Sequence, residues 1–120
     1  MEQIGYKLTT QDLTTHAGFQ WSLGKEVQAS GKGKLCTEGW LHYYRHPLLA
    51  VLHNPAHAAI EDPRLFECCV NGEVKHDGWM KSGCSQLTLT KEIDLPVVSE
   101  EARVRYAIAC ALQVRHTTMF

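Results

Sequence analysis

The sequence has no long hydrophobic run and no excess of positive charge. Residues 1–7 contain neither the basic segment nor the apolar segment of a signal peptide, and no apolar stretch approaches the ~20 residues that cross a bilayer. Twelve basic and thirteen acidic side chains give a formal net charge of −1, whereas proteins that bind duplex nucleic acid usually carry a basic excess. We therefore expect a protein of the cytoplasm that binds neither membranes nor duplex nucleic acid.

Common catalytic and phosphate-binding motifs are also missing. The basic segment 31–34 is not a phosphate-binding loop, because Glu26 stands where that motif needs glycine and Gly33 where it needs serine or threonine. No nucleophile elbow or protease signature surrounds any cysteine. We therefore interpret residues 31–34 as a solvated loop and predict no catalytic residue.

Cysteine and histidine gather in the centre of the chain, and both residue types are ligands of zinc. Two histidine pairs with a spacing of four follow a cysteine, but prolines interrupt the segment, so the four rings cannot share one helix face. No CxxC pair accompanies them. We predict no metal site and no cofactor. The residues considered are Cys36, His42, His46, His53 and His57, with Pro47 and Pro55 between them.

The five cysteines form no disulfide framework, because their number is odd and their spacing irregular. We interpret them as reduced thiols, as in cytosolic proteins. Cys68 and Cys69 are adjacent in a strand-like run, so their side chains should point to opposite faces of a sheet.

The length and composition are those of one globular domain over residues 1–120. A chain of 120 residues with 44% hydrophobic and 21% charged side chains can build a real core. Periodicity predicts an α+β fold: a mostly antiparallel sheet, a short buried helix, and a C-terminal helix packed on one face of the sheet.

Local signals place the elements of this fold. Strands are predicted near residues 6–8, 18–24, 39–44, 64–70, 73–75 and 86–93, and Asn71-Gly72 is typical of a two-residue hairpin turn between the fourth and fifth of them. Pro47 should begin the short helix, and Asn54-Pro55 should end it. Ser99 should cap the last helix. Its buried face is predicted to contain Val104, Ala107, Ile108, Ala111 and Leu112.

An aromatic centre lies between the loop and the short helix, at residues 40–47. Aromatic residues with arginine commonly anchor interfaces, although they also fill the cores of small sheet proteins. We expect Trp40 and Leu41 to be core. A predicted binding surface combines the partly exposed part of this segment with the basic loop, and its residues are Tyr44, Arg45, His46, Lys32 and Lys34.

Several segments together resemble one family. Residues 31–58 follow the pattern GxxxLCxxGWLHxYxxPLLAVLxNPxHA, and the segments 63–68, 81–84 and 104–111 continue the match in order. From about Tyr6 to Val114 the chain is similar to a domain of unknown function found in phage and prophage proteins. The resemblance implies a small phage-encoded accessory protein in the host cytoplasm and assigns no catalytic residues.

Three function classes are open at this point. The first is a protein that acts by binding and inhibits a host enzyme or defence complex, in the manner of an anti-CRISPR antagonist. The second is a binder or sponge of a nucleotide-type small ligand, which would be anionic. The third is an enzyme similar to ADP-ribosyltransferases, with Tyr6-Lys7 on the first strand and Glu92 late in the chain. We expect binding without turnover; a second copy of the chain also remains open as a partner.

Overall fold

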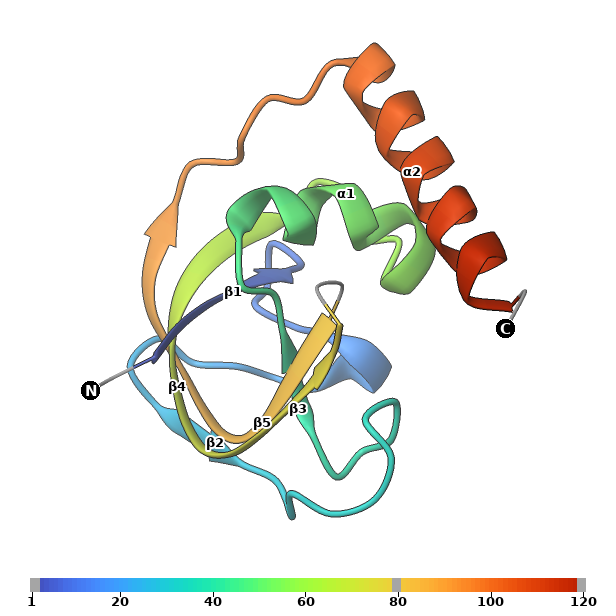
Figure 1. Ribbon diagram of the computed structural model, residues 1–120. Helices are drawn as coiled ribbons and strands as arrows, with labels where there is room; N and C mark the ends of the chain where they lie inside the picture. Colours follow the sequence, from blue (N-terminus) through green and yellow to red (C-terminus); the bar gives the residue numbers. More distant parts are fainter. Residues whose placement is uncertain (1–2, 79–80, 119–120) are drawn as a thin grey trace.

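The structure is a computed structural model that describes residues 3–78 and 81–118 (Figure 1). Its elements occur in the order β1 (Gln3–Thr9), a 3-10 turn η1 (His16–Gly18), β2 (Glu26–Gln28), β3 (Leu41–Tyr43), α1 (Pro47–His57), β4 (Arg64–Asp77), β5 (Lys81–Ile93) and α2 (Glu100–Thr118). The five strands form one sheet in which all pairs are antiparallel. The predicted α+β class is confirmed.

The long hairpin of β4 and β5 organises the sheet. The first half of β4 pairs with β1 on its other side, while β5 pairs with both β2 and β3 along its length. The register between β4 and β5 shifts twice, once between Glu67 and Cys68 and once between Asn71 and Val74. The two strands curve strongly around the core (Figure 1).

The main core lies within this curved sheet. Leu87 and Leu89 of β5 are buried there. Cys68 is 1% exposed while the neighbouring Cys69 is only partly buried, so the prediction of opposite faces is confirmed. Leu8, Ala50 and Leu65 form a second cluster that joins α1 to the sheet. The main cluster consists of Trp21, Tyr43, Phe66, Cys68, Val70, Cys84, Leu87 and Leu89.

The hairpin predicted at Asn71-Gly72 is wrong. Strand β4 continues through both residues to Asp77, which pairs with Lys81 of β5. Gly72 has a φ of 76°, the left-handed conformation that the turn prediction assumed, but the structure uses it at the register shift between Asn71 and Val74. A β-bulge and a turn therefore share the same sequence signal.

The strand predicted over residues 18–24 is also wrong. Only an isolated bridge between Thr14 and Gln20 forms there, after η1. Phe19 and Trp21 alternate with Gln20 as expected, yet Trp21 is 2% exposed and Phe19 is 46% exposed. The segment is an irregular loop fixed by one buried indole.

Helix α1 is longer than predicted and contains Pro55. His46 caps it, because its Nδ1 accepts a hydrogen bond of 3.1 Å from the Leu48 N–H. Proline lacks the donor for the carbonyl four residues earlier, but near the helix end this costs one hydrogen bond and the helix continues to His57. Ala50, Val51 and His53 are buried, as expected for this helix.

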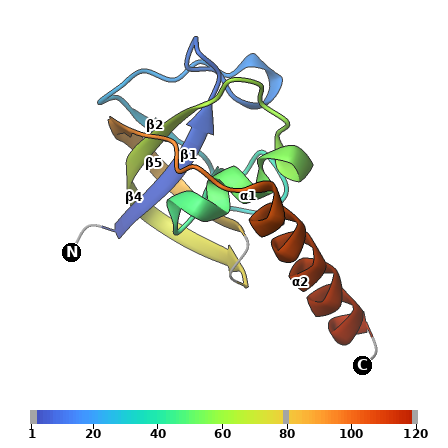
Figure 2. The same cartoon turned by 90° about the horizontal axis from the view of Figure 1, so that it is seen from above.

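The predicted burial of one face of α2 is wrong as well. Ser99 caps the helix as expected, since its Oγ accepts from the Ala102 N–H at 3.1 Å. Val104, Ile108 and Leu112 are nevertheless 52–57% exposed, and Ala111 is exposed too. Helix α2 contacts α1 through Tyr106, whose hydroxyl bonds His53 Nε2. Its C-terminal half projects beyond the sheet (Figure 2).

Geometry explains which face of α2 is exposed. Val104 and Ile108 each lie two residues from Tyr106, which is about 200° around a helix at about 100° per residue. The apolar stripe therefore faces away from the rest of the molecule because Tyr106 faces α1.

Candidate functional site

A cavity of about 770 Å³ opens between the end of β1, the loop that carries η1, strand β3 and the C-terminal end of α1. Its volume falls in the range of about 300–1,000 Å³ typical of small-molecule sites. We call it the Lys7 cavity. Its lining residues are Lys7, Leu8, Thr10, Thr15, His16, Ala17, Phe19, Trp21, Cys36, Thr37, Glu38, Trp40, Leu41, His42, Tyr44, Ala50, Asn54, His57, Ala58, Ala59, Ile60, Glu61 and Lys81.

Lys7 lies on β1 and is largely enclosed. Its Nζ donates a hydrogen bond of 2.6 Å to the His42 carbonyl and lies 5.3 Å from the centre of the Trp21 ring. The pKa of Lys7 is lowered from 10.5 to about 8, mainly by burial; Cys68 and Cys84 oppose this shift, and the nearby Lys81 adds a small contribution to it. At neutral pH the group remains mostly an ammonium ion.

The pKa values of other basic side chains nearby are lowered as well. Burial lowers the pKa of His42, and repulsion from Lys81, Lys7 and His16 adds to that effect. Burial also lowers the pKa of His57, again with a contribution from Lys81. The two lysines and the histidines thus converge on one region from β1, β3, α1, β5 and η1.

Aromatic rings form another wall of the cavity. Trp21 Nε1 donates to Thr15 Oγ1 at 2.9 Å, which fixes the buried indole. Phe19 packs against it edge to face, with ring centroids 5.4 Å apart. Trp40 also lines the cavity, and its Nε1 donates to the Gly33 carbonyl. The wall therefore presents one exposed ring, Phe19, supported by a fixed one.

A cluster of four rings closes the α1 side and reaches α2. Tyr44 Oη and His57 Nδ1 are 2.5 Å apart, and both residues line the cavity. His53 packs between them and Tyr106, with ring centroids 4.7 Å from His57 and 5.3 Å from Tyr106. Burial raises the pKa of Tyr44 to about 12, so this phenol keeps its proton at neutral pH.

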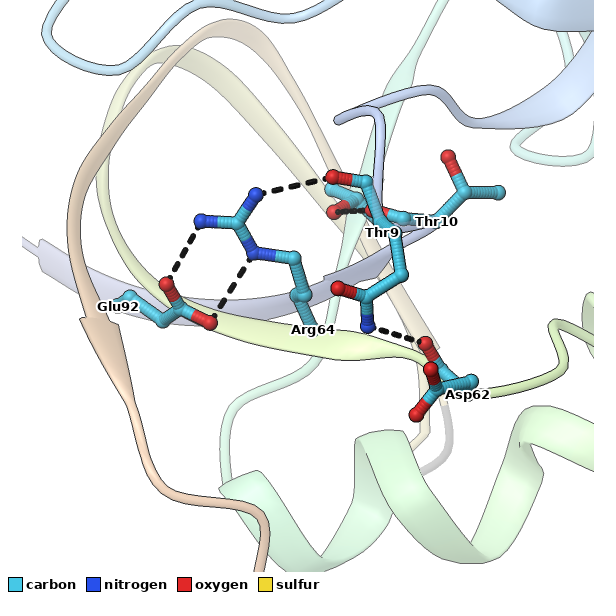
Figure 3. Close-up of polar contacts among 6 residues, drawn as sticks. Thr9, Thr10, Asp62, Arg64 and Glu92 are labelled. Carbon is cyan, nitrogen blue, oxygen red and sulfur yellow. Dashed lines mark hydrogen bonds and ion pairs between the residues drawn. The ribbon is translucent and has the colours of Figure 1, made fainter.

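Hydrogen bonds connect the ends of two loops that form the cavity walls (Figure 3). Gln11 Nε2 donates to the Asp62 carbonyl at 2.7 Å, and Arg64 Nη1 donates to the Gln11 carbonyl at 2.9 Å. Arg64 also forms a bidentate ion pair with Glu92, with N–O distances of 3.1 and 2.7 Å. These bonds hold the loop after β1 against the loop that follows α1.

Asn54 fixes the second of these loops from inside. Its Oδ1 accepts from the Ile60 N–H and its Nδ2 donates to the Ile60 carbonyl, both at 2.9 Å. The carbonyl of Asn54 also accepts from the Ala58 N–H at 3.0 Å. The cavity wall at residues 58–60 is therefore set by the end of α1.

The structure separates the predicted binding residues. Tyr44 lines the cavity, whereas Arg45 points to the β4–β5 hairpin and donates to the Gly78 carbonyl. His46 is occupied as the cap of α1. Lys32 and Lys34 are exposed in their loop and do not line the cavity.

The sequence patterns did not identify most of the charged and aromatic side chains that line the cavity. Lys7 entered only as a position of the enzyme hypothesis, and Phe19, His57 and Lys81 were not grouped with it. A lysine within a strand next to the core residue Leu8 was the one available signal, because charged side chains are rarely enclosed without a role or a partner.

The cysteines and histidines form no metal centre in the part of the chain that the structure describes: no three His, Cys, Asp or Glu side chains there lie close enough together. Cys36 is exposed and lines the cavity. Burial raises the pKa of Cys68 to about 12 and that of Cys84 to about 11, so both thiols are poor nucleophiles.

The two positions of the ADP-ribosyltransferase-like hypothesis have different surroundings. Lys7 lines the cavity, but Glu92 does not, and its carboxylate is engaged by Arg64. Strand register places both residues beside Phe66, Lys7 from β1 and Glu92 from β5.

Comparison with known proteins identifies a family. The family model "Domain of unknown function (DUF7666)" matches residues 3–101, so the chain belongs to that family. The expected resemblance to a domain of unknown function is confirmed. Neither the curated proteins nor the solved structures contain a match. Within residues 3–78 and 81–118, no helix has the length and hydrophobicity needed to span a membrane.

Proposed function

We propose that this member of the DUF7666 family acts by binding a small anionic ligand in the Lys7 cavity, without chemical turnover. One observation carries the proposal: Lys7 and Lys81 converge with an exposed ring, Phe19, in a cavity of about 770 Å³. Concave sites that combine apolar walls with a few convergent polar groups and a perturbed pKa are typical ligand sites. Of the three classes that the sequence left open, this geometry favours the small-ligand binder.

Cys36 offers a test that does not depend on knowing the ligand. It is exposed and lines the cavity, so an occupant should slow its alkylation by a maleimide. The full chain would be purified rapidly from cells, analysed by native mass spectrometry, and alkylated before and after extensive dialysis. We expect a co-purified small molecule and a Cys36 that reacts faster once this molecule is removed.

Cys110 serves as the internal control, because it is partly buried on α2 and does not line the cavity. Its alkylation rate should not change on dialysis. A Cys36 that reacts at the same rate under all conditions, with no bound molecule, would contradict the proposal.

A second candidate is the antagonist of a host enzyme or defence complex, encoded by a phage and active in the host cytoplasm. The supporting observation is that Arg45, His46, Lys32 and Lys34 are all exposed and accessible to a partner. Arg45→Ala should then weaken the binding of a co-purifying protein by about 1–3 kcal/mol. Phe19→Ala, in the cavity, should leave that binding unchanged. The reverse pattern would favour the small ligand.

A further inference from the structure

We propose that the ligand of the Lys7 cavity is a phosphate monoester carried by a flat ring, a nucleotide-type molecule, with Lys7 and Lys81 holding the phosphate and Phe19 covering the ring. This inference rests on the proposed function, because it specifies the ligand of that same site.

The first argument is charge. The ion pairs found within the described residues join Arg64 to Glu92 and Arg105 to Glu101, so neither neutralises a lysine of the cavity. Lys7 and Lys81 instead line the same cavity. Two ammonium groups that line one cavity attract an anion that can reach both of them. A phosphate monoester carries about −1.5 to −2 charges at pH 7 and three acceptor oxygens, and so matches two ammonium groups.

The second argument is the position of the rings. The Trp21 ring already has the Lys7 ammonium near its face and packs against Phe19 in a T-shaped arrangement. Phe19 itself is 46% exposed although its neighbour is buried. An aromatic ring that is supported from behind and open in front can stack on the flat face of a base. The lysines and this ring line the same cavity, which favours one ligand carrying both groups.

The third argument concerns the carboxylates of the cavity. Glu38 and Glu61 both line it and are exposed. A carboxylate repels phosphate but accepts hydrogen bonds from sugar hydroxyls, as in dinucleotide-binding sites. A nucleotide provides hydroxyls between its ring and its phosphate, whereas a simple aryl phosphate does not.

Isothermal titration calorimetry on the full chain at low ionic strength tests this inference. The ligands are the four nucleoside 5′-monophosphates, their nucleosides and inorganic phosphate. We expect at least one monophosphate to bind tenfold or more tightly than both its nucleoside and inorganic phosphate. Added salt should weaken that monophosphate more than the nucleoside, because the ionic contacts are screened.

Matched variants locate the two halves of the ligand. Lys81→Gln should lower the affinity for the monophosphate at least tenfold and leave the weak nucleoside binding unchanged, whereas Lys91→Gln, on the same strand outside the cavity, should change neither. Phe19→Ala should weaken monophosphate and nucleoside alike. Leu23→Ala, which removes a similarly exposed apolar side chain elsewhere, should weaken neither.

Three outcomes would overturn the inference, and they differ in what they leave standing. If no monophosphate binds more tightly than its nucleoside and inorganic phosphate, but a molecule of another class protects Cys36 from alkylation, the inference fails and the proposed function stands. If no compound protects Cys36 and none co-purifies, both fail. A monophosphate that binds equally well to Lys81→Gln and Phe19→Ala would also overturn the inference, since it would bind elsewhere.

Discussion

Lys7 is a charged side chain where the fold alone would favour an apolar one. It lies on β1 of the sheet and lines the cavity, and its pKa is lowered to about 8 mainly by burial. Buried charges usually lower stability and are retained at sites with a function. The contribution of Lys7 to folding is therefore expected to be unfavourable.

The first prediction is that Lys7→Met stabilises the protein. Below about pH 8 both the folded and the unfolded chains hold the proton, and the full desolvation cost applies. A shift from 10.5 to about 8 corresponds to at most roughly 3 kcal/mol, and loss of the hydrogen bond to His42 offsets about 1 kcal/mol of that. We expect the free energy of unfolding at pH 7 to rise by about 2 kcal/mol, measured by urea denaturation.

The pH dependence of this difference has a definite sign. Between pH 8 and 10.5 the folded chain releases the Lys7 proton while the unfolded chain keeps it, so the parent gains stability relative to Lys7→Met. The difference between the two should shrink over this window. Lys75→Met is the control, because Lys75 also lies over a tryptophan ring and bonds a carbonyl, but outside the cavity. Equal effects of the two substitutions would show that Lys7 is not specially buried.

The cysteines give a second prediction at this scale. Cys68 and Cys84 are buried thiols with pKa values raised to about 12 and 11, so few thiolates are present at pH 7.5. Iodoacetamide should modify exposed Cys36 at least roughly 100-fold faster than either in the native state. All five thiols should react in denaturant, as peptide mapping by mass spectrometry can show. Rapid native modification of Cys84 would mean that the strand opens locally.

The position or role of an individual residue could be predicted where a single local rule determines it. Period-two alternation placed Cys68 and Cys69 on opposite faces, and the cap position of Ser99 followed from its hydroxyl. The cavity could not be predicted in this way. Its basic groups come from β1, η1, β3, α1 and β5, and no spacing in the sequence brings Lys7 and Lys81 together.

Among the secondary-structure elements, the β4–β5 hairpin shows how one signal supports two structures. Gly72 adopts a positive φ inside a continuous strand, and a Cβ at this position would collide with the Ser85 side chain. The Ser85 hydroxyl accepts from the Glu73 N–H at 2.8 Å. The sequence could not distinguish a bulge from a turn here, because both need the same backbone conformation. The choice depends on the pairing of β4 with β5 along its whole length.

The third prediction tests this bulge. Gly72→Ala should lower the free energy of unfolding by about 2–3 kcal/mol, of which about 1–2 come from the left-handed backbone and about 1 from the displaced Ser85 hydrogen bond. Gly78→Ala is the matched control, because Gly78 also has a positive φ but, among the described residues beyond its chain neighbours, no atom lies within 4 Å of an added Cβ. Gly78→Ala should lower the free energy of unfolding only by the about 1–2 kcal/mol that come from the left-handed backbone. Equal losses, measured by urea denaturation, would place the Ser85 side chain elsewhere.

Helix α1 shows a similar limit of local rules. Proline at position 55 was expected to stop the helix, but the end of α1 is held instead by the side-chain bonds of Asn54 to Ile60. These bonds join residues six apart, and a rule about one dipeptide does not include them. The same bonds shape the cavity wall, so helix length and site geometry are linked.

The fourth prediction follows from that link. Asn54→Ala should lower the free energy of unfolding by about 2 kcal/mol through the loss of two hydrogen bonds. It should also speed hydrogen exchange of the amides at residues 58–60, which lose their anchor. Gln28→Ala is a suitable control, because Gln28 is exposed and bonds only Glu26. An unchanged exchange rate at residues 58–60 would show that α1 alone fixes this wall.

Considered as a whole, the molecule is a sheet domain with an appended helix. The family match ends at residue 101, close to the beginning of α2 at Glu100. The apolar stripe of α2 was found from its period in the sequence. Periodicity identifies a face but does not say what covers it, and here Tyr106 turns the opposite face toward α1.

The last prediction tests this view of α2. Burial of Ile108 would make Ile108→Asp cost several kcal/mol, because the substitution would bury an unpaired charge. With Ile108 54% exposed in the single chain, we expect a change within about 0.5 kcal/mol instead. Leu89→Asp, at a fully buried position of β5, is the positive control and should unfold the domain. Both variants would be compared with the parent by urea denaturation at low protein concentration, with the mass in solution measured by light scattering. A large loss for Ile108→Asp in a monomeric parent would contradict the exposed stripe, whereas a loss that grows with protein concentration would show that the stripe is covered by a second copy of the chain.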